Sequence, residues 1–209
     1  MSTNAAAQKT LKTPKTANGR NVQKIFKLGL ILFIVTAITG LILGVVYEIT
    51  ASPIKQTQER LKNEALSGAL PEAENFSLLE LAPGAPDIVK EVQGGTKDGV
   101  GTGYCITVSP KGYGGPIEIV VGIASDGALR AIRILNQTET PGLGAKAADA
   151  AFTNQYSEKQ VERMAVVKTT PSTPDQIQAI SGATITSEAV TLGVNTALEY
   201  WQTNLRGGK

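Results

Sequence analysis

The sequence predicts an α+β protein with one N-terminal membrane-spanning helix, followed by a twisted antiparallel sheet with flanking helices. Two observations support this prediction. Residues 28–47 form an uncharged apolar run, and at about 1.5 Å per helical residue the run matches the roughly 30 Å hydrocarbon core of a bilayer. From residue 88 onward, apolar residues alternate with polar ones in short segments separated by Gly-rich turns, which is typical of strands joined by hairpins.

The first 27 residues are polar and basic. They contain six Lys or Arg residues and no Asp or Glu, whereas both signs of charge follow the apolar run. The positive-inside rule then predicts a cytoplasmic tail over 1–27, a transmembrane helix over 28–48 that contacts the lipid bilayer, and an extracytoplasmic remainder. A cleaved signal peptide is the alternative, although the run is longer than the ~7–15-residue core of such signals.

Residues 49–86 are interpreted as a linker with an amphipathic helix. Ser52-Pro53 favours a helix start, and the apolar residues between 54 and 70 have charged neighbours, as expected for a half-exposed helix. The Pro- and Gly-containing stretch 83–86 then separates this segment from the sheet domain, which we place at 87–205.

The sheet domain begins with period-two segments. Four strands are predicted at 88–92, 103–109, 117–123 and 129–135, with a Gly-rich turn over 94–99 and a hairpin turn at Asp126-Gly127. Helices are predicted over 147–155 and 188–201, a strand over 161–169 and a loop over 171–178.

The composition excludes several kinds of chemistry. The chain has one Cys and no His, so an internal disulfide, a thiolate zinc cluster and His-based acid–base catalysis are ruled out. We expect no metal site. Cys105 lies in an alternating apolar run and is expected to be buried rather than reactive. A net charge of +2 gives no indication of nucleic-acid binding.

Two stretches are candidates for a binding site. Around Thr184, Gly182 and Ala183 leave space for a phosphate, which at a helix start would meet free N–H groups and the positive end of the dipole. The same run is also consistent with an N-capping turn, with Glu188 favourable in the first turn. Residues 136–146 form a Pro- and Gly-containing loop that carries polar groups, and a plain loop before a helix is its alternative interpretation.

Three separated segments resemble, in order, the G subunit of Rnf electron-transport complexes, which is related to the C subunit of Nqr. They are the turn 111–116, the E-T-P-G-L-G loop at 139–144 and the S-G-A-T motif at 181–184, and the resemblance extends from residue 25 onward. In that family a flavin transferase joins FMN through its phosphate to the threonine of the motif. The family commonly has an acidic residue six positions before this threonine, where this chain has Gln178.

The resemblance implies a covalent FMN phosphoester on Thr184. It also implies contact with the cofactor for Tyr113, Glu139, Thr140, Leu143, Gly144, Lys146, Ser181, Gly182, Ala183, Ile185 and Thr186. The residues themselves favour Thr184 over Thr186 as the attachment point, because the stiff β-branched Ile185 precedes Thr186.

The implied function is that of a flavoprotein electron carrier in a Na⁺- or H⁺-translocating ferredoxin:NAD oxidoreductase, assembled with further membrane subunits. Such a carrier needs no catalytic acid or base of its own, because the flavin performs the chemistry. Two alternatives are a membrane-anchored FMN-binding sensory or regulatory protein and a noncovalent extracytoplasmic binding module.

Overall fold

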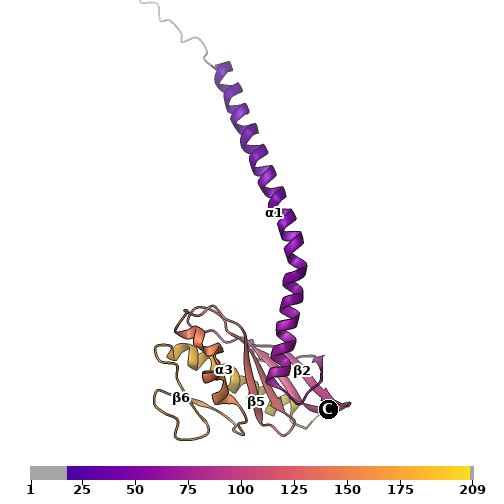
Figure 1. The fold of residues 1–209 in the computed structure, drawn as a ribbon, viewed down its shortest axis with the longest axis vertical. Coiled ribbons are helices and arrows are strands. Elements are labelled where there is room, and N and C mark those ends of the chain that lie inside the picture. The colour runs from indigo at the N-terminus through magenta and orange to yellow at the C-terminus, as the bar shows by residue number, and fades with distance from the viewer. Residues whose placement is uncertain (1–17, 208–209) are drawn as a thin grey trace, which may run out of the picture. The chain divides into compact units, whose positions relative to one another are not determined.

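The computed structural model describes residues 18–207 (Figure 1). Most of the predicted tail over 1–27 therefore lies outside the described residues. The chain divides into two compact units, Met1–Lys55 and Gln56–Lys209, and each unit is considered by itself.

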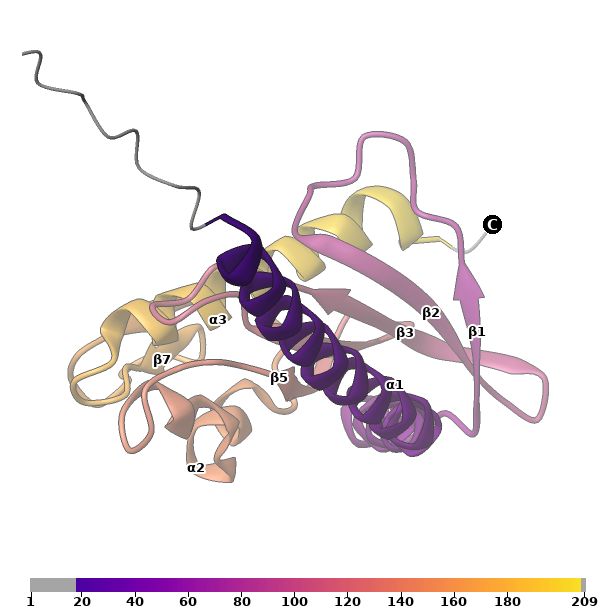
Figure 2. The same cartoon turned by 90° about the horizontal axis from the view of Figure 1, so that it is seen from above.

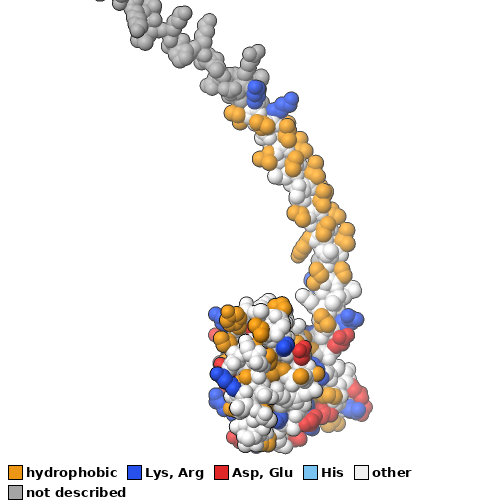
Figure 3. Space-filling model, turned by 60° about the vertical axis from the view of Figure 1, so that its left-hand side comes forward, with side chains coloured by type: hydrophobic (Ala, Val, Ile, Leu, Met, Phe, Trp, Pro, Cys, Tyr) orange, Lys and Arg blue, Asp and Glu red, His pale blue; other side chains and the backbone are white. Residues whose placement is uncertain are grey.

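The first unit contains the N-terminal part of α1, the helix Asn18–Ala69. Side chains 24–50 are all exposed, and the most apolar 18-residue window of the helix has a mean hydropathy of 2.7. Figure 3 shows hydrophobic side chains along the visible side of this helix, with Lys and Arg side chains next to the undescribed N-terminal residues. By length and composition, this helix can cross a membrane, as predicted.

The predicted helix start at Ser52-Pro53 is wrong, because α1 continues through Pro53. A proline removes one backbone donor and crowds the preceding turn. The residues that follow, including Lys55, Gln56 and Glu59, are strong helix formers. Their propensity, together with the helix already formed before Pro53, allows the helix to continue.

The second unit contains a five-stranded antiparallel sheet in the order β1-β2-β3-β4-β5. Its strands are β1 Asn75–Leu79, β2 Val89–Lys97, β3 Val100–Val108, β4 Glu118–Ala124 and β5 Leu129–Asn136. The twist between β1, β2 and β3 is visible in Figure 2. The predicted fold class is confirmed, and so is the hairpin at Asp126-Gly127, where Gly127 N–H donates to the Ala124 carbonyl over 2.9 Å.

The first hairpin turn is tighter than predicted. Gly94 and Gly95 lie inside β2, and the turn is made by Asp98 and Gly99, which have φ angles of 51° and 78°. At Gly95 an added Cβ would lie 2.6 Å from Leu70 and 2.8 Å from the Ala73 Cβ. Gly95 is therefore needed for close packing inside a strand rather than for a turn, a distinction that composition alone does not make.

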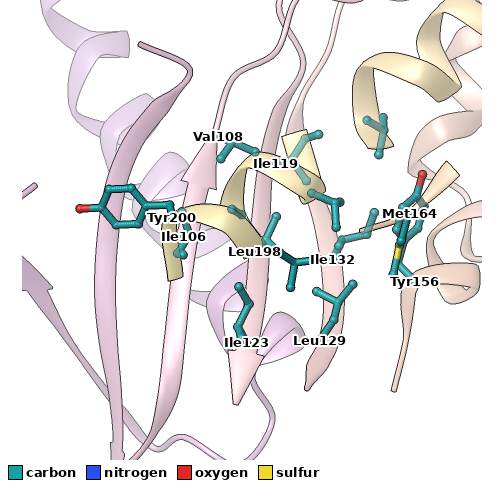
Figure 4. Close-up of a cluster of buried hydrophobic side chains, with 14 of the residues drawn as sticks. Ile106, Val108, Ile119, Ile123, Leu129, Ile132, Tyr156, Met164, Leu198 and Tyr200 are labelled. Atoms are coloured by element: carbon teal, nitrogen blue, oxygen red, sulfur yellow. The ribbon is translucent and has the colours of Figure 1, made fainter. Parts of the chain in front are cut away.

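The two faces of the sheet are covered by different helices. Successive strand residues point to opposite faces, and Ile106 packs in the cluster that includes α3 residues, whereas Cys105 packs with the end of α1. Figure 4 shows the first cluster, with Leu198 and Tyr200 of the C-terminal helix set against strand side chains such as Ile119. This core fixes α3 on the sheet.

Cys105 is fully buried between β3 and the end of α1. Its Sγ lies 3.7 Å from the Leu66 carbonyl oxygen, and burial raises the pKa of the thiol to about 12. The thiol therefore stays protonated and unreactive at neutral pH, as expected from the sequence.

The segment after the sheet is more broken than the sequence predicts. In place of the predicted helix 147–155, the chain forms three short pieces: η1 Gly144–Ala148, α2 Ala150–Thr153 and η2 Asn154–Tyr156. The predicted strand 161–169 is shorter than expected and forms β6 Ala165–Val167. The predicted loop 171–178 contains a further strand, β7 Gln176–Gln178, which pairs with β6 in parallel. The last long helix, α3 Thr184–Tyr200, starts four residues before the predicted residue 188 and continues into η3 Trp201–Leu205. The helical geometry thus already begins at the candidate threonine.

Candidate functional site

Three segments far apart in the sequence meet at one cavity of about 530 Å³. They are the turn before β4, the loop after β5 and the start of α3. The lining residues are Tyr113, Glu139, Thr140, Leu143, Gly144, Gly182, Ala183, Thr184, Ile185 and Thr186. Ten of the twelve candidate site residues therefore share one cavity, and its volume lies within the range typical of cofactor sites, roughly 300–1,000 Å³.

The start of α3 is held by backbone and serine contacts. Gly182 has a φ of +77°, a conformation that glycine adopts without strain. Ala183 is the N-cap residue and no side chain caps the helix. The Ser187 hydroxyl instead accepts the Ile180 N–H over 2.9 Å and donates to the Ala183 carbonyl over 3.0 Å. The Thr184 hydroxyl takes no part in these bonds, so the capping interpretation does not explain Thr184.

Glu139 joins the three segments. Its side chain is buried, with 5% of its surface exposed. One carboxylate oxygen accepts the Gly114 N–H over 2.9 Å, and the other accepts the Thr186 hydroxyl over 2.5 Å. The carboxylate therefore holds the turn before β4 and the start of α3 against its own loop.

Glycines make room for this carboxylate. A Cβ on Gly112 would contact Glu139 Oε1 and Ile117, and a Cβ on Gly144 would lie 2.5 Å from Glu139 Oε2 and 2.7 Å from Thr186 Oγ1. Neither position has space for a side chain. Gly112 was not among the candidate site residues, although its place in the run K-G-Y-G-G-P, opposite the E-T-P-G-L-G loop, was the signal available for it.

The two threonines at the start of α3, Thr184 and Thr186, have opposite environments. Thr186 is 1% exposed and bonded to Glu139, whereas Thr184 is partly exposed and lines the cavity. Ile185, which precedes Thr186, is 54% exposed. What distinguishes the two hydroxyls is burial together with an existing hydrogen bond.

The cavity walls offer two kinds of surface. Tyr113, Leu143 and Ile185 are 71%, 44% and 54% exposed and present apolar area suited to a planar ring. The first turn of α3 presents the N–H groups of Thr184 and Ile185, which have no carbonyl partner within the helix and suit a phosphate. This donor set fits a flavin nucleotide.

Two candidate residues lie elsewhere. Lys146 lines a smaller cavity of about 210 Å³ together with Gln178, and Ser181 is exposed and does not line the main cavity. At Gln178, the backbone N–H donates to Gln155 Oε1 over 2.7 Å and the carbonyl accepts from Gln155 Nε2 at 3.3 Å. Within residues 18–207, no group of three or more Cys, Asp or Glu side chains is placed to hold a metal ion.

The chain is similar to known proteins over most of its length. Residues 112–199 match the FMN-binding domain family. The chain is 36% identical over 191 residues to the G subunit of the Na⁺-translocating ferredoxin:NAD⁺ oxidoreductase complex of Acetobacterium woodii, with 85% of this chain and 92% of that one covered. It is 36% identical over 193 residues to the G subunit of the proton-translocating ferredoxin:NAD⁺ oxidoreductase complex of Clostridium ljungdahlii, covering 92% and 100%.

A solved structure shares the fold. It is the C subunit of the Na⁺-translocating NADH-quinone reductase from Parabacteroides distasonis, with a TM-score of 0.57, 22% identity, and 74% of this chain and 96% of that chain covered. The site geometry, the matched domain and the relatives agree with the resemblance of the three segments. The chain therefore belongs to the family of Rnf complex G subunits, which contain an FMN-binding domain.

Proposed function

We propose that this chain is the membrane-anchored electron carrier of an ion-translocating ferredoxin:NAD oxidoreductase complex, with FMN bound covalently to Thr184. The observation that carries this proposal is the placement of Thr184. Its hydroxyl is free of the bonds that hold the turn and lies at a cavity that also presents helix N–H donors and apolar walls. Both parts of a flavin nucleotide, the phosphate and the ring, have matching surfaces there.

The covalent link is a phosphoester. The Thr184 oxygen forms a bond to the flavin phosphate, and a P–O bond to the leaving group of the flavin donor breaks, with the hydroxyl proton going to that leaving group. A flavin transferase supplies the donor. The protein gains the mass of one FMN less one water, and the attached phosphate keeps a negative charge beside the first turn of α3, where the helix dipole stabilises it.

The chain's own residues hold and shield the flavin rather than act as acids or bases. When bound, FMN supplies reversible acceptance and release of electrons. Tyr113, Leu143 and Ile185 exclude water from the ring through their apolar surfaces, while the Glu139 bonds fix the loops that carry them. Thr140 and the backbone at Gly182 and Ala183 complete the wall.

The topology follows from charge. We propose a tail over 1–27 in the cytoplasm, a span over 28–48 in the cell membrane, a connecting segment over 49–86 and an FMN-binding domain over 87–205 outside the cytoplasm. Six basic residues and no acidic ones precede the span, and such a bias fixes orientation. Covalent attachment suits an exported domain because a released FMN would be lost to dilution. The other membrane subunits of the complex are its partners.

The proposal is tested by mass spectrometry of the full-length chain, purified in detergent from cells that also express its flavin transferase. We expect an intact mass higher than that of the sequence by one FMN less one water. We also expect yellow fluorescence that stays with the protein band on a denaturing gel. An unmodified mass, with flavin lost on denaturation, would contradict covalent attachment and favour a noncovalent binding module.

Topology has a separate test. In spheroplasts, an added protease should remove the domain that follows the span and leave an N-terminal tag intact. If the tag is digested in intact spheroplasts, the N-terminus lies outside the cytoplasm and the proposed orientation is wrong.

A further inference from the structure

One charged side chain lies in the wall of the candidate flavin cavity. Of the ten lining residues, Glu139 alone carries a carboxylate, and it is 5% exposed. The other nine are aromatic, aliphatic, glycine or hydroxyl residues. Any electrostatic effect of the lining side chains on a molecule in the cavity therefore comes chiefly from Glu139.

Both oxygens of the Glu139 side chain lie beside hydrogen-bond donors. Both oxygens act as acceptors, one from the Gly114 N–H at 2.9 Å and the other from the Thr186 hydroxyl at 2.5 Å. Such donors suit a carboxylate, which only accepts hydrogen bonds. The short bond to Thr186 has the length of a charge-assisted O–H···O⁻ contact.

No cation neutralises this charge within residues 18–207. None of the ion pairs found there includes Glu139. Lys111, which precedes Gly112 in the turn before β4, and Lys146, which lies seven residues after Glu139, are exposed. Neutral donors stabilise a buried carboxylate without cancelling its field, so the negative charge acts on the cavity.

Resting on the proposed function, we propose that Glu139 is a positioning residue that also sets the flavin's reduction potential. Its carboxylate ties the three cavity loops together, and its uncompensated negative charge lowers the potential of the bound FMN. An electron added to the ring brings negative charge towards the carboxylate. Because the Glu139 side chain is buried, solvent screens this repulsion only in part, and the repulsion disfavours the reduced flavin.

The test is a reductive titration of the full-length flavinylated chain, following flavin absorbance against a reference dye. Glu139→Gln keeps the shape and the acceptor for Gly114 N–H and removes the charge. We expect FMN to remain attached and the midpoint potential to shift upward. The matched control is Glu188→Gln, which removes an exposed carboxylate four residues after Thr184 on α3 and should leave the potential unchanged because solvent screens it.

A second variant separates charge from geometry. Thr186→Val removes one donor to Glu139 and retains the carboxylate, so the potential should fall, because the negative charge is then less compensated. An unchanged or raised potential in Thr186→Val, or an unchanged potential in flavin-loaded Glu139→Gln, would overturn the proposal. If the Glu139→Gln protein does not become flavinylated, the midpoint potential of the Thr186→Val protein tests the proposal instead.

The role of Glu139 in holding the three loops together can be measured without flavin. In flavin-free Thr184→Val protein, adding Glu139→Ala should lower the thermal unfolding midpoint, while adding Glu188→Ala should not. Equal unfolding midpoints for the Glu139→Ala and Glu188→Ala proteins would show that Glu139 does not hold the three loops together. A wild-type chain that carries no flavin at all would instead refute the proposed function and leave this structural result standing.

Discussion

The two ends of α3 are held by different forces. Around its first turn, polar contacts dominate, with Thr186 bonded to Glu139 and Ser187 bonded to Ile180 and Ala183. Further along, apolar packing dominates, with Val190, Val194 and Leu198 in the main core. One helix thus carries both the candidate site and a large part of the fold. Substitutions at the N-terminal end of α3 should alter flavin attachment or the flavin's potential, and substitutions towards its C-terminal end should alter the free energy of unfolding.

The comparison is tested most strongly at Thr184. Thr184→Val keeps the shape of the side chain and removes the only atom to which the phosphate can bond in our proposal. We expect a folded protein with no covalent flavin, measured by fluorescence on a denaturing gel and by peptide mass spectrometry. The control is Thr186→Val, which should keep the adduct. Fluorescence that survives in the first variant and is lost in the second would reverse the assignment.

The opposite end is tested by Leu198→Ala. Leu198 is 1% exposed in the core beneath α3, and such truncations cost about 2–5 kcal/mol through lost burial and a residual cavity. Denaturant unfolding of the full-length chain should show this loss, while the folded fraction keeps its covalent FMN. Loss of flavin attachment at temperatures where the variant is folded would contradict the division of roles.

A smaller effect is expected from Thr186→Val. The change leaves one oxygen of the buried Glu139 carboxylate without its donor, which costs about 1.5–3 kcal/mol for a bond to a charged group. Thermal unfolding measures the loss. Combined with Glu139→Ala, the two losses should not add, because both variants remove the contact between Thr186 and Glu139. Strict additivity would show that the bond is not formed in solution.

The smallest effect is expected for Leu192→Ala, on the same helix as Leu198. Leu192 is 53% exposed and does not belong to either core cluster, so stability should change by about 0.5 kcal/mol or less. The same denaturant assay applies. A loss as large as that of Leu198→Ala would mean that this side of α3 is covered in the protein.

The sequence alone determined the elements with strong local patterns. The uncharged run predicted the membrane-spanning helix, and period-two alternation with Asp126-Gly127 predicted the last hairpin of the sheet. These features depend on interactions between residues near each other in the chain, and the 3.6- and 2-residue periods report them directly. The resemblance of three short segments to a known family pointed to the cofactor and to Thr184.

How those segments work together depends on contacts that form only in the folded protein. The sequence does not show that Glu139 bonds to Gly114 and Thr186, residues 25 and 47 positions away, or that Gly95 and Gly144 are small because other side chains occupy their space. It also placed the start of the last helix at residue 188, because the small and hydroxyl residues before it are typical of a capping turn, whereas Ala183 is the N-cap and α3 starts at Thr184. Such contacts depend on packing between distant segments, which local periodicity does not encode. In our proposal, burial and hydrogen bonding of Thr186 add a second reason to prefer Thr184, beside the stiff Ile185 that precedes Thr186.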